Sequence, residues 1–350
     1  MRQKVLLGMS GGIDSSVAAM VLQEQGFEVV GITFIFSGSD MKDFYHSADS
    51  AKMLAGKLGI EHYVVDLREE FKNQIIRYFI NEYRSGNTPF PCAVCNPKLK
   101  FYNLKKYADK LSCNFISTGH YVNIIEIEGV KYISSGKDRN KDQSFFLWGL
   151  QKELINRFIF PLGDLYKNDV REIAQQKGFE DLTQKKESLG ICFIEGKNYS
   201  KCLENSGLNS IPGNFTDLKG KVIGKHKGVF HYTIGQRRGL GVHFNKPVFV
   251  AEIKTESNEV VLADFDEMFR SKIFLNNTHF VDKNSVDFNK TYTVKIRYRL
   301  QQNLCKLKLL DGCKAQIELE KPVAMVANGQ TAVIYDEDRV IGGGFIESSE

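Results

Sequence analysis

The first part of the chain, to about residue 200, alternates short apolar runs with longer amphipathic periods. The apolar runs predict strands at residues 5–7, 28–36, 62–66 and 114–118. The amphipathic periods predict helices at residues 15–25, 47–58, 69–84 and 98–111. Strands that alternate with helices form parallel sheets through right-handed crossovers, so we expect a doubly wound, mainly parallel α/β domain. A hairpin that turns at Glu128-Gly129 is predicted at residues 122–134.

The pattern changes beyond about residue 205, where the helical periods disappear. Short runs of alternating apolar and polar positions replace them, at residues 247–252, 259–263, 291–300, 305–310, 315–319 and 332–335. Turn residues such as Asp311-Gly312 and Asn328-Gly329 separate these runs. The pattern is typical of small β barrels or sandwiches. We therefore expect two small β domains after the α/β domain, which divides the chain into residues 1–204, 205–270 and 271–350.

The composition is that of an ordinary globular protein, with 42% hydrophobic and 25% charged residues among 350. It excludes a disordered, collagenous or coiled-coil chain. No apolar run reaches the ~20 residues of a membrane span, and the strand-like run directly after Met1 leaves no room for a signal peptide. The seven cysteines are an odd and sparse set, which argues against a disulfide scaffold and for a reducing compartment. We expect a cytoplasmic protein that does not associate with membranes.

The net charge of +5 alone says little about binding partners, but the basic residues are unevenly distributed along the chain. Residues 217–246 contain seven Lys or Arg and one acidic residue, and residues 294–308 contain five and none. Such stretches suit a polyanion, and the alternative is an ordinary solvated surface. Lys295, Arg297 and Arg299 alternate with apolar residues, which predicts three basic side chains on one face of a strand.

A glycine-rich loop joins the first predicted strand to the first predicted helix. It comprises Gly8, Met9, Ser10, Gly11, Gly12, Ile13, Asp14 and Ser15. Adjacent glycines let backbone amides point into one concavity, and we expect Asp14, Ser15 and Ser16 to cap the helix. Such a loop at the carboxyl edge of a parallel sheet predicts a phosphate site, and the alternative is a turn without ligand. It is neither a Walker A loop nor a G-x-G-x-x-G loop.

Two segments carry cysteines with candidate chemistry. Cys92 and Cys95 lie in a Pro-rich segment that we expect to be a loop before a helix, whose dipole would lower the pKa of the Cys95 thiol. The pair could also be half of a zinc site or a thioredoxin-like redox pair, although a second C-x-x-C or spaced His pair is missing. Cys192 follows Gly190 and nearby lysines, which fits a reactive thiolate, but its neighbours Ile191 and Phe193 favour the alternative of a buried apolar cysteine.

The loop at residues 8–15 matches S-G-G-x-D-S, the pyrophosphate loop of the ATP-pyrophosphatase superfamily. Further motifs follow in order at residues 95–96 (CN), 118–121 (TGHY), 141–144 (KDQS), 189–193 (LGICF) and 231–241 (HYTIGQRRGLG). Together they resemble the tRNA-specific 2-thiouridylase family over residues 4 to 345. The resemblance implies an adenine nucleotide α-hydrolase-like domain followed by a central β domain and a C-terminal tRNA-binding barrel.

The resemblance also implies a reaction. That family replaces the 2-oxygen of the wobble uridine of tRNA by sulfur, through ATP-dependent adenylation of the base and transfer from a cysteine persulfide. Carried over, Cys192 would hold the persulfide and Cys95 would be the second nucleophile. A Cys95–Cys192 disulfide would form, and a reductant would have to open it. The implied partners are tRNA and a persulfide sulfur donor, and the implied cofactor is ATP with Mg²⁺, without a tightly bound metal or organic group. We expect a monomer.

The same resemblance assigns the ATP and base contacts. ATP would lie over residues 8–15, beside Phe34 and Gly119, with Asp14 orienting the loop or a Mg²⁺. The target base would meet Phe90, Pro91 and Cys92, where the family usually has Asn-Pro-Asp. The family usually has Met at position 34 as well. These departures allow Phe90 to stack on the uridine and make Cys92 a second candidate thiol beside Cys95.

Contacts to tRNA are implied at His120, Lys141, Asp142, Gln143, Arg297, Tyr298 and Gln330. Residues 236–238 are interpreted as a loop that faces tRNA or another domain. Two alternative functions stay open: an amide or amine ligase with the same loop, and a non-catalytic RNA-binding protein. The two placed cysteines disfavour the ligase, and failure to bind ATP would favour the RNA-binding protein.

Overall fold

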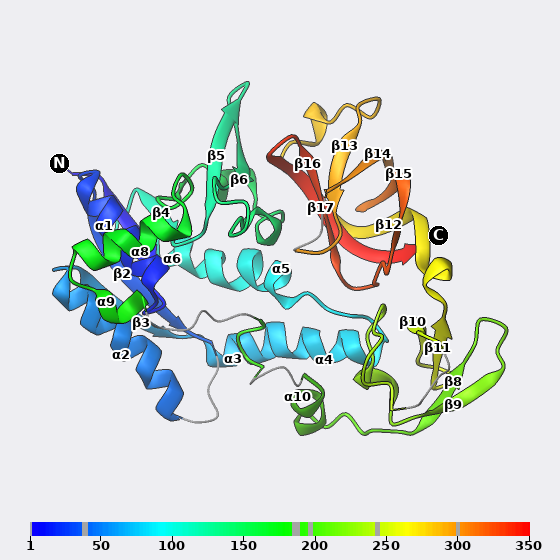
Figure 1. The fold of residues 1–350 in the computed structure, drawn as a ribbon. Helices are drawn as coiled ribbons and strands as arrows, with labels where there is room; N and C mark the ends of the chain where they lie inside the picture. Colours follow the sequence, from blue (N-terminus) through cyan, green and yellow to red (C-terminus); the bar gives the residue numbers. More distant parts are fainter. Residues whose placement is uncertain (1, 37–40, 184–189, 195–198, 242–245, 299–301) are drawn as a thin grey trace.

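The computed structural model describes residues 2–36, 41–183, 190–194, 199–241, 246–298 and 302–350 (Figure 1). Its N-terminal domain contains a five-stranded parallel sheet in the order β3-β2-β1-β4-β7. The strands are β1 (Lys4–Gly8), β2 (Glu28–Ile35), β3 (Glu61–Asp66), β4 (Phe115–Thr118) and β7 (Phe158–Ile159). The predicted strands of this domain are therefore confirmed, and β7 is a short strand that the apolar pattern did not predict.

Helices cover both faces of this sheet. The described helices, of which only some pack on the sheet, are α1 (Ile13–Glu24), α2 (Met41–Lys57), α3 (Arg68–Phe71), α4 (Arg77–Arg84), α5 (Pro91–Cys95), α6 (Phe101–Lys110), α7 (Lys152–Ile155), α8 (Lys167–Gln176), α9 (Glu180–Thr183) and α10 (Tyr199–Asn205). Successive β1 side chains point to opposite faces, so Leu6 packs with α6, whereas Val5 and Leu7 pack with α1 and α8. These two cores confirm the doubly wound α/β class.

The strand order places a switch point between β1 and β4. The chain runs outward from β1 through β2 to β3 on one side and from β4 to β7 on the other. Ligands of open α/β sheets bind at the carboxyl ends of the strands that flank such a point. The glycine-rich loop follows β1 and Gly119 follows β4, so the two segments that we predicted to hold nucleotide meet there.

The segment of Cys92 and Cys95 is a helix rather than the predicted loop. Helix α5 begins at Pro91, whose fixed φ suits the first helical position. A π-helical segment, η2 (Asn96–Lys100), joins α5 to α6 and contains Pro97. Proline lacks an N–H and clashes with the carbonyl four residues earlier, and the wider π turn accommodates both defects. A similar π segment, η1 (Lys72–Ile76), joins α3 to α4.

The C-terminal part contains two β sheets. The smaller has the order β10-β11-β8-β9, from β8 (Gly213–Thr216), β9 (Val222–His226), β10 (Phe249–Lys254) and β11 (Glu259–Ala263). The larger contains β12 (Phe269–Phe280), β13 (Tyr292–Lys295), β14 (Asn303–Leu310), β15 (Lys314–Ala324), β16 (Thr331–Asp336) and β17 (Arg339–Ser349). Pairing between β12 and β17 closes these six strands into a barrel. The expected pair of small β domains is confirmed.

The predicted hairpin is also confirmed, as β5 (Val122–Ile127) and β6 (Val130–Ser135). Its turn uses left-handed conformations, with φ of 51° at Glu128 and 75° at Gly129. The hairpin extends the barrel sheet, because Ser134 of β6 pairs with Arg339 of β17. Figure 1 shows it standing between the parallel sheet and the barrel, with α5 beneath it. The N-terminal domain and the barrel therefore share a continuous interface.

Among the described residues, we find no helix that combines the length and the apolar character needed to cross a bilayer.

Candidate active site

The glycine-rich loop is closed by its own serines. Gly11 adopts φ of 73°, which favours glycine, and Gly12 is the N-cap of α1 without a capping side chain. The Ser15 hydroxyl accepts from the Ser10 amide at 3.2 Å and donates to the Gly12 carbonyl at 3.1 Å. Ser16 also donates to that carbonyl, at 3.0 Å. The expectation that Asp14, Ser15 and Ser16 cap α1 is therefore wrong, because both serines bond the loop carbonyl instead.

Asp14 is held by two residues that the sequence did not single out. Its Oδ1 accepts from Lys167 Nζ and from the Tyr121 hydroxyl, each at 2.6 Å. The Lys167 side chain is only 6% exposed and that of Asp14 is 36% exposed, so the ion pair is buried on the lysine side and partly screened by solvent on the aspartate side. Lys167 therefore brings a buried positive charge beside a loop that has no lysine of its own. Its distance of 153 residues from Asp14 left no local signal in the sequence.

Gly119 lies directly against the first turn of α1. A Cβ at this position would lie 2.8 Å from the carbonyl carbon of Asp14 and 2.9 Å from the Ser15 amide nitrogen. Only glycine permits this approach without displacing backbone. Phe34, near the end of β2, is half-buried with ring centroids 6.0 Å from Phe36 and 6.1 Å from Tyr107. The predicted nucleotide residues thus share one edge of the sheet.

Cys95 and the Cys192 segment are brought together across 97 positions of sequence. Cys95 packs against an apolar cluster that includes Val94 and Leu99, and Phe193 packs against the same cluster. The Phe193 ring is anchored edge-on, 5.5 Å from Phe71 and 5.2 Å from Phe79. Cys192 therefore lies next to a side chain that is fixed beside α5. The residue itself is exposed, unlike the buried apolar cysteine considered above.

Electrostatics link Cys92, Cys95, Cys192 and Lys100. Burial raises the pKa of the Cys95 thiol to about 12, and the positive charge of Lys100 lowers it. Burial likewise raises the pKa of Cys92 to about 11, and a charge on Cys192 would raise the pKa of either helix thiol further. Surrounding protein atoms also desolvate the Cys192 thiol, which raises its pKa, whereas the positive charge of Lys100 lowers it.

These shifts contradict the expected low pKa of Cys95. The residue ends the short helix α5 instead of starting a long one, so it has no helix N-terminus beside it. Desolvation is the larger effect and favours the neutral thiol. Burial also lowers the pKa of the half-buried Lys100 amine. The resting thiols are consequently neutral, and Lys100 is the cation that stabilises whichever thiolate forms.

Aromatic packing holds the segment before Cys92. Phe90 is half-buried, with ring centroids 5.4 Å from Phe145 and 5.5 Å from Phe146. Pro91 is buried. From the barrel, Gln330 Nε2 donates to the Thr88 carbonyl at 2.9 Å. Gln330, predicted to contact tRNA, therefore ties the barrel to the loop that leads into α5.

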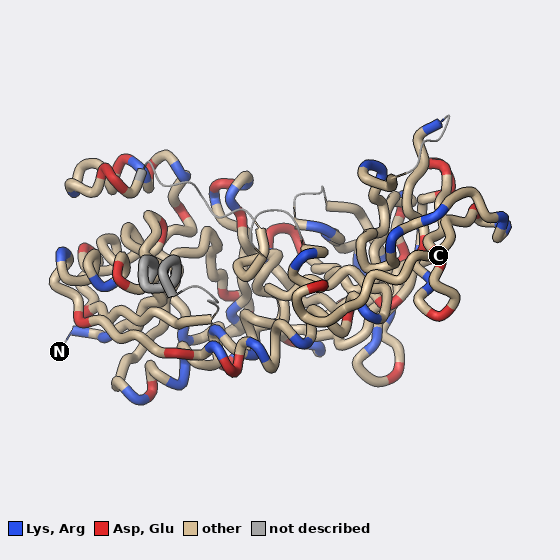
Figure 2. Tube along the Cα trace, turned by 90° about the horizontal axis from the view of Figure 1, so that it is seen from below, with Lys and Arg blue, Asp and Glu red and all other residues tan. Residues whose placement is uncertain are grey.

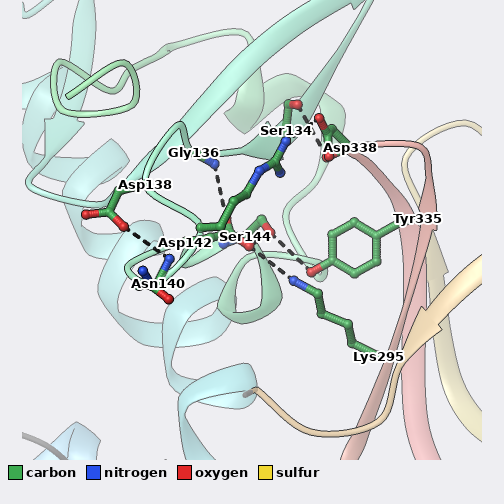
Figure 3. Close-up of polar contacts among 10 residues, drawn as sticks. Ser134, Gly136, Asp138, Asn140, Asp142, Ser144, Lys295, Tyr335 and Asp338 are labelled. Atoms are coloured by element: carbon green, nitrogen blue, oxygen red, sulfur yellow. Dashed lines mark hydrogen bonds and ion pairs between the residues drawn. The ribbon is translucent and has the colours of Figure 1, made fainter. Parts of the chain in front are cut away.

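Asp142 lies in a buried network between the N-terminal domain and the barrel (Figure 3). Its carboxylate accepts from the Gly136 and Ser144 amides, each at 3.1 Å, and from the Ser144 hydroxyl at 2.9 Å. Lys295 of β13 approaches it at 3.3 Å, and the Tyr335 hydroxyl of β16 lies 3.1 Å from the Ser144 hydroxyl. The structure thus places Asp142 inside the interface and not on the surface expected for a tRNA contact.

The same loop also reaches the nucleotide edge. Asp138 accepts from the Lys167 amide at 3.0 Å, and Gln143 Oε1 accepts from the Tyr121 amide at 3.0 Å. Both Lys167 and Tyr121 hold Asp14. Residues 136–144 therefore bridge the barrel and the glycine-rich loop. Lys141 in this segment is half-buried and has a bonding partner.

The predicted alternation of basic and apolar residues is present where the structure describes it, because Val294 and Ile296 are buried, but the two described bases, Lys295 and Arg297, are half-buried and bonded to other parts of the protein. Strand β13 ends at Lys295, which pairs with Asp142. Arg297 is half-buried and donates to the Met325 carbonyl at 2.5 Å. Arg299 lies outside the described residues. The period of two was read as an exposed face because the internal partners of these bases lie far away in the sequence.

His120 and Tyr298 are packed on aromatic neighbours. His120 Nδ1 lies 2.6 Å from the Thr118 hydroxyl, and its ring meets Phe101 edge-on at 5.9 Å. Burial, with a smaller effect of Lys100, lowers the pKa of His120 well below its usual value, so it stays neutral at pH 7. Tyr298 lies 4.5 Å from Phe146, ring centroid to centroid. Phe146 also contacts Phe90, so Tyr298 lies close to the segment that leads into α5.

Charge alone does not delimit an RNA surface. Figure 2 shows Lys and Arg positions interspersed with Asp and Glu positions along the described trace. Within the described ranges, no group of three or more His, Cys, Asp or Glu side chains is arranged to hold a metal ion. The zinc alternative for the Cys92/Cys95 pair therefore gains no support.

A doubly wound nucleotide-binding domain with a pyrophosphate-type loop, followed by two β modules, defines the class. Three family models match in that order: the "tRNA methyl transferase HUP domain" over residues 3–196, the corresponding "PRC-barrel domain" over residues 201–264 and the "Aminomethyltransferase beta-barrel domain" over residues 270–346.

Full-length relatives identify the family more narrowly than the three domain models do. The tRNA-specific 2-thiouridylase MnmA 1 of Bacteroides fragilis (strain YCH46) is 43% identical over 359 residues, which cover 99% of this chain and 98% of that protein. The tRNA-specific 2-thiouridylase MnmA 2 of Phocaeicola vulgatus is 44% identical over 345 residues, covering 98% and 97%. The chain belongs to the tRNA-specific 2-thiouridylase family, which confirms the resemblance seen in its motifs.

Solved structures give more distant matches. A 4-thiouridine synthetase–RNA complex with bound ATP is 19% identical, has a TM-score of 0.35, and covers 58% of this chain and 50% of its own. The U34-tRNA thiolase NcsA from Methanococcus maripaludis is 18% identical with the same TM-score, covering 58% and 64%.

Proposed function

We propose that this enzyme is a tRNA-uridine 2-sulfurtransferase that uses ATP to replace the 2-oxygen of the wobble uridine by sulfur. Family membership over nearly the whole chain supports this assignment. The observation that carries the mechanism is the proximity of Cys192 to Cys95, across 97 positions, at the edge of the sheet where the glycine-rich loop lies. Two thiols are needed because one carries the sulfur atom and the other discharges it.

The first step activates the base. The 2-oxygen of uridine attacks the α-phosphate of ATP, and pyrophosphate leaves with its charge held by the amides of residues 8–15. Lys167 adds a positive charge beside these amides and orients Asp14. Phe34 and Gly119 border the nucleotide. ATP enters as its magnesium complex, and Asp14, already bonded to two side chains, serves to orient the loop.

The second step transfers sulfur. Cys192 carries a persulfide, Cys192–S–SH, received from a sulfur donor. The Cys95 thiolate attacks the inner sulfur of this persulfide and releases hydrosulfide, which attacks carbon 2 of the adenylated uridine. AMP leaves with the former 2-oxygen, and Cys95 and Cys192 are left as a disulfide. A dithiol reductant returns two electrons and two protons before the next cycle.

Substrate contacts are distributed over all three domains. The N-terminal domain, residues 1–204, performs the chemistry, and Phe90, Pro91 and Cys92 face the flipped base. The central domain, residues 205–270, and the C-terminal barrel, residues 271–350, position the tRNA. The proposed tRNA contacts remain His120, Lys141, Gln143, Arg297, Tyr298 and Gln330. We further propose a cytoplasmic monomer that receives its sulfur from a persulfide-bearing protein.

The two other functions are not favoured. An amide or amine ligase needs the loop but not a pair of neighbouring thiols. A non-catalytic RNA-binding protein needs neither. The adjacent thiols and the intact loop are both accounted for by thiolation.

Deletion of this gene and mass spectrometry of tRNA nucleosides test the proposal. Wild type and Cys313→Ser should restore 2-thiouridine, because Cys313 is exposed on the barrel. Cys192→Ser and Cys95→Ser should not restore it. An unchanged 2-thiouridine level in the deletion strain, or full restoration by Cys192→Ser, would contradict the proposal.

A further inference from the structure

Cys92 and Cys95 form a thiol pair on one helical turn. They are residues two and five of α5, which begins at Pro91. Residues three apart on a helix are neighbours on its surface. Cys92 stands where the family usually has a carboxylate, so this chain has a third thiol at a position that normally offers none. Cys92 and Cys95 are both half-buried.

Cys192 is the third thiol near the Cys92/Cys95 pair. Phe193 packs against the cluster that contacts Cys95, which holds the neighbouring Cys192 at α5. Charge on Cys192 would be felt by both helix thiols, and Lys100 acts on all three. Even so, no three His, Cys, Asp or Glu side chains in the described part of the chain converge as metal ligands do. The arrangement suits exchange between thiols rather than coordination of one ion.

We propose that Cys92 is a resolving thiol, which opens the Cys95–Cys192 disulfide left by each turnover and forms a Cys92–Cys95 disulfide in its place. This inference rests on the proposed thiolation. Without such a residue, Cys192 stays blocked until a reductant reaches it. With it, Cys192 is free to accept its next persulfide while the oxidation is stored on α5.

The exchange balances without an added oxidant. The Cys92 thiolate attacks Cys95 Sγ, the Cys95–Cys192 bond breaks, and Cys192 leaves as a thiolate that takes up the proton lost by Cys92. Lys100 stabilises the negative charge throughout. The two-electron oxidation stays within the three cysteines until a dithiol reductant supplies two electrons and two protons to the Cys92–Cys95 disulfide.

Helix geometry permits this disulfide with a local adjustment. Cβ atoms of residues three apart on a helix are ~5–6 Å apart, whereas a disulfide needs ~3.5–4.5 Å. Closure thus requires a shift of about 1–2 Å. The shift falls where α5 ends at Cys95 and α-helical bonding already changes to the π geometry of η2.

A single-turnover experiment tests the proposal. The full-length enzyme, persulfidated at Cys192 with a low-molecular-weight persulfide, is mixed with ATP and tRNA without reductant. The reaction is stopped with acid and an alkylating agent, and peptides are mapped by mass spectrometry without reduction. Wild type should yield 2-thiouridine, a Cys92–Cys95 disulfide and alkylated Cys192. For Cys92→Ser, which also alters the proposed base contact, the readout is taken per 2-thiouridine formed: each product molecule should be matched by a Cys95–Cys192 disulfide, and no reacted enzyme should carry alkylated Cys192. Cys313→Ser should behave as wild type.

The outcomes separate the two proposals. A wild-type enzyme that makes 2-thiouridine and keeps only the Cys95–Cys192 disulfide would overturn the role of Cys92 and leave the proposed function intact. A wild-type enzyme that makes no 2-thiouridine would overturn the proposed function itself. Metal analysis of the same samples adds one more check: iron or zinc bound by wild type and lost in Cys92→Ser would replace the exchange mechanism by a metal site.

Discussion

Replacing Asp142 with alanine should loosen the barrel from the N-terminal domain. The Asp142 side chain is 4% exposed and its partner Lys295 is 16% exposed, so the ion pair is largely desolvated. Removing the carboxylate deprives two amides and a hydroxyl of their acceptor and leaves the Lys295 ammonium without its counter-ion. Breaking one side of a buried pair costs about 3–5 kcal/mol.

A matched control crosses the same interface. Arg139 and Asp338 also pair across it, but their side chains are 58% and 55% exposed. Exposed pairs contribute about 0–1 kcal/mol. Asp338→Ala should therefore change the free energy of barrel docking by no more than this amount, although the two substitutions remove the same charge.

Trp148 provides the assay. It is the single tryptophan, it is buried, and its ring centroid lies 5.5 Å from that of Phe345 on β17. Urea titration followed by Trp148 fluorescence should show that Asp142→Ala lowers the free energy of unfolding by about 3–5 kcal/mol. A loss no larger than that of Asp338→Ala would refute the assignment of Asp142 to a stabilising interface.

Three further predictions concern the nucleotide edge and the thiols. Gly119→Ala should weaken ATP binding in calorimetry by about 1–3 kcal/mol, because the new Cβ displaces the Asp14 backbone. The control is Gly56→Ala, which should bind ATP normally because Gly56 is exposed on α2 and has open space where its Cβ would lie. Equal ATP affinity of the two variants would contradict this prediction. Lys167→Met should weaken ATP binding by about 1.5–3 kcal/mol through loss of a charge-assisted hydrogen bond, and unchanged affinity would exclude it from the site. Alkylation of Cys95 in the resting enzyme should rise about tenfold per pH unit through pH 10, because burial raises its pKa to about 12, and a plateau below pH 9 would contradict this.

The sequence predicted the elements whose signals are local. Alternating apolar runs and helical periods located β1 to β4 and their helices, and the Glu128-Gly129 turn located the hairpin. The glycine-rich loop was recognisable because its chemistry lies within eight consecutive residues. Pro91 gave a wrong prediction, because a Pro-rich segment is typical of a loop, whereas proline is also favourable at the first position of a helix.

Features that depend on long-range partners could not be predicted. Lys167 gave no signal because its role comes from contact with Asp14. Lys295 and Arg297 were predicted to lie on a face available to phosphate groups. Sequence alone cannot show that Lys295 pairs with Asp142 and that Arg297 donates to the Met325 carbonyl. Hydrophobic periodicity reports whether a position faces inward, but not which polar group it meets there.

Isotope transfer tests the central claim most directly. The purified enzyme is loaded with a ³⁴S persulfide at Cys192, freed of excess persulfide, and given ATP and unmodified tRNA for a single turnover. We predict that ³⁴S appears in the 2-thiouridine of the wobble position, with AMP formed in equal amount. Label that stays on the protein, or AMP formation without labelled 2-thiouridine, would contradict the claim that Cys192 delivers the sulfur atom to an adenylated base.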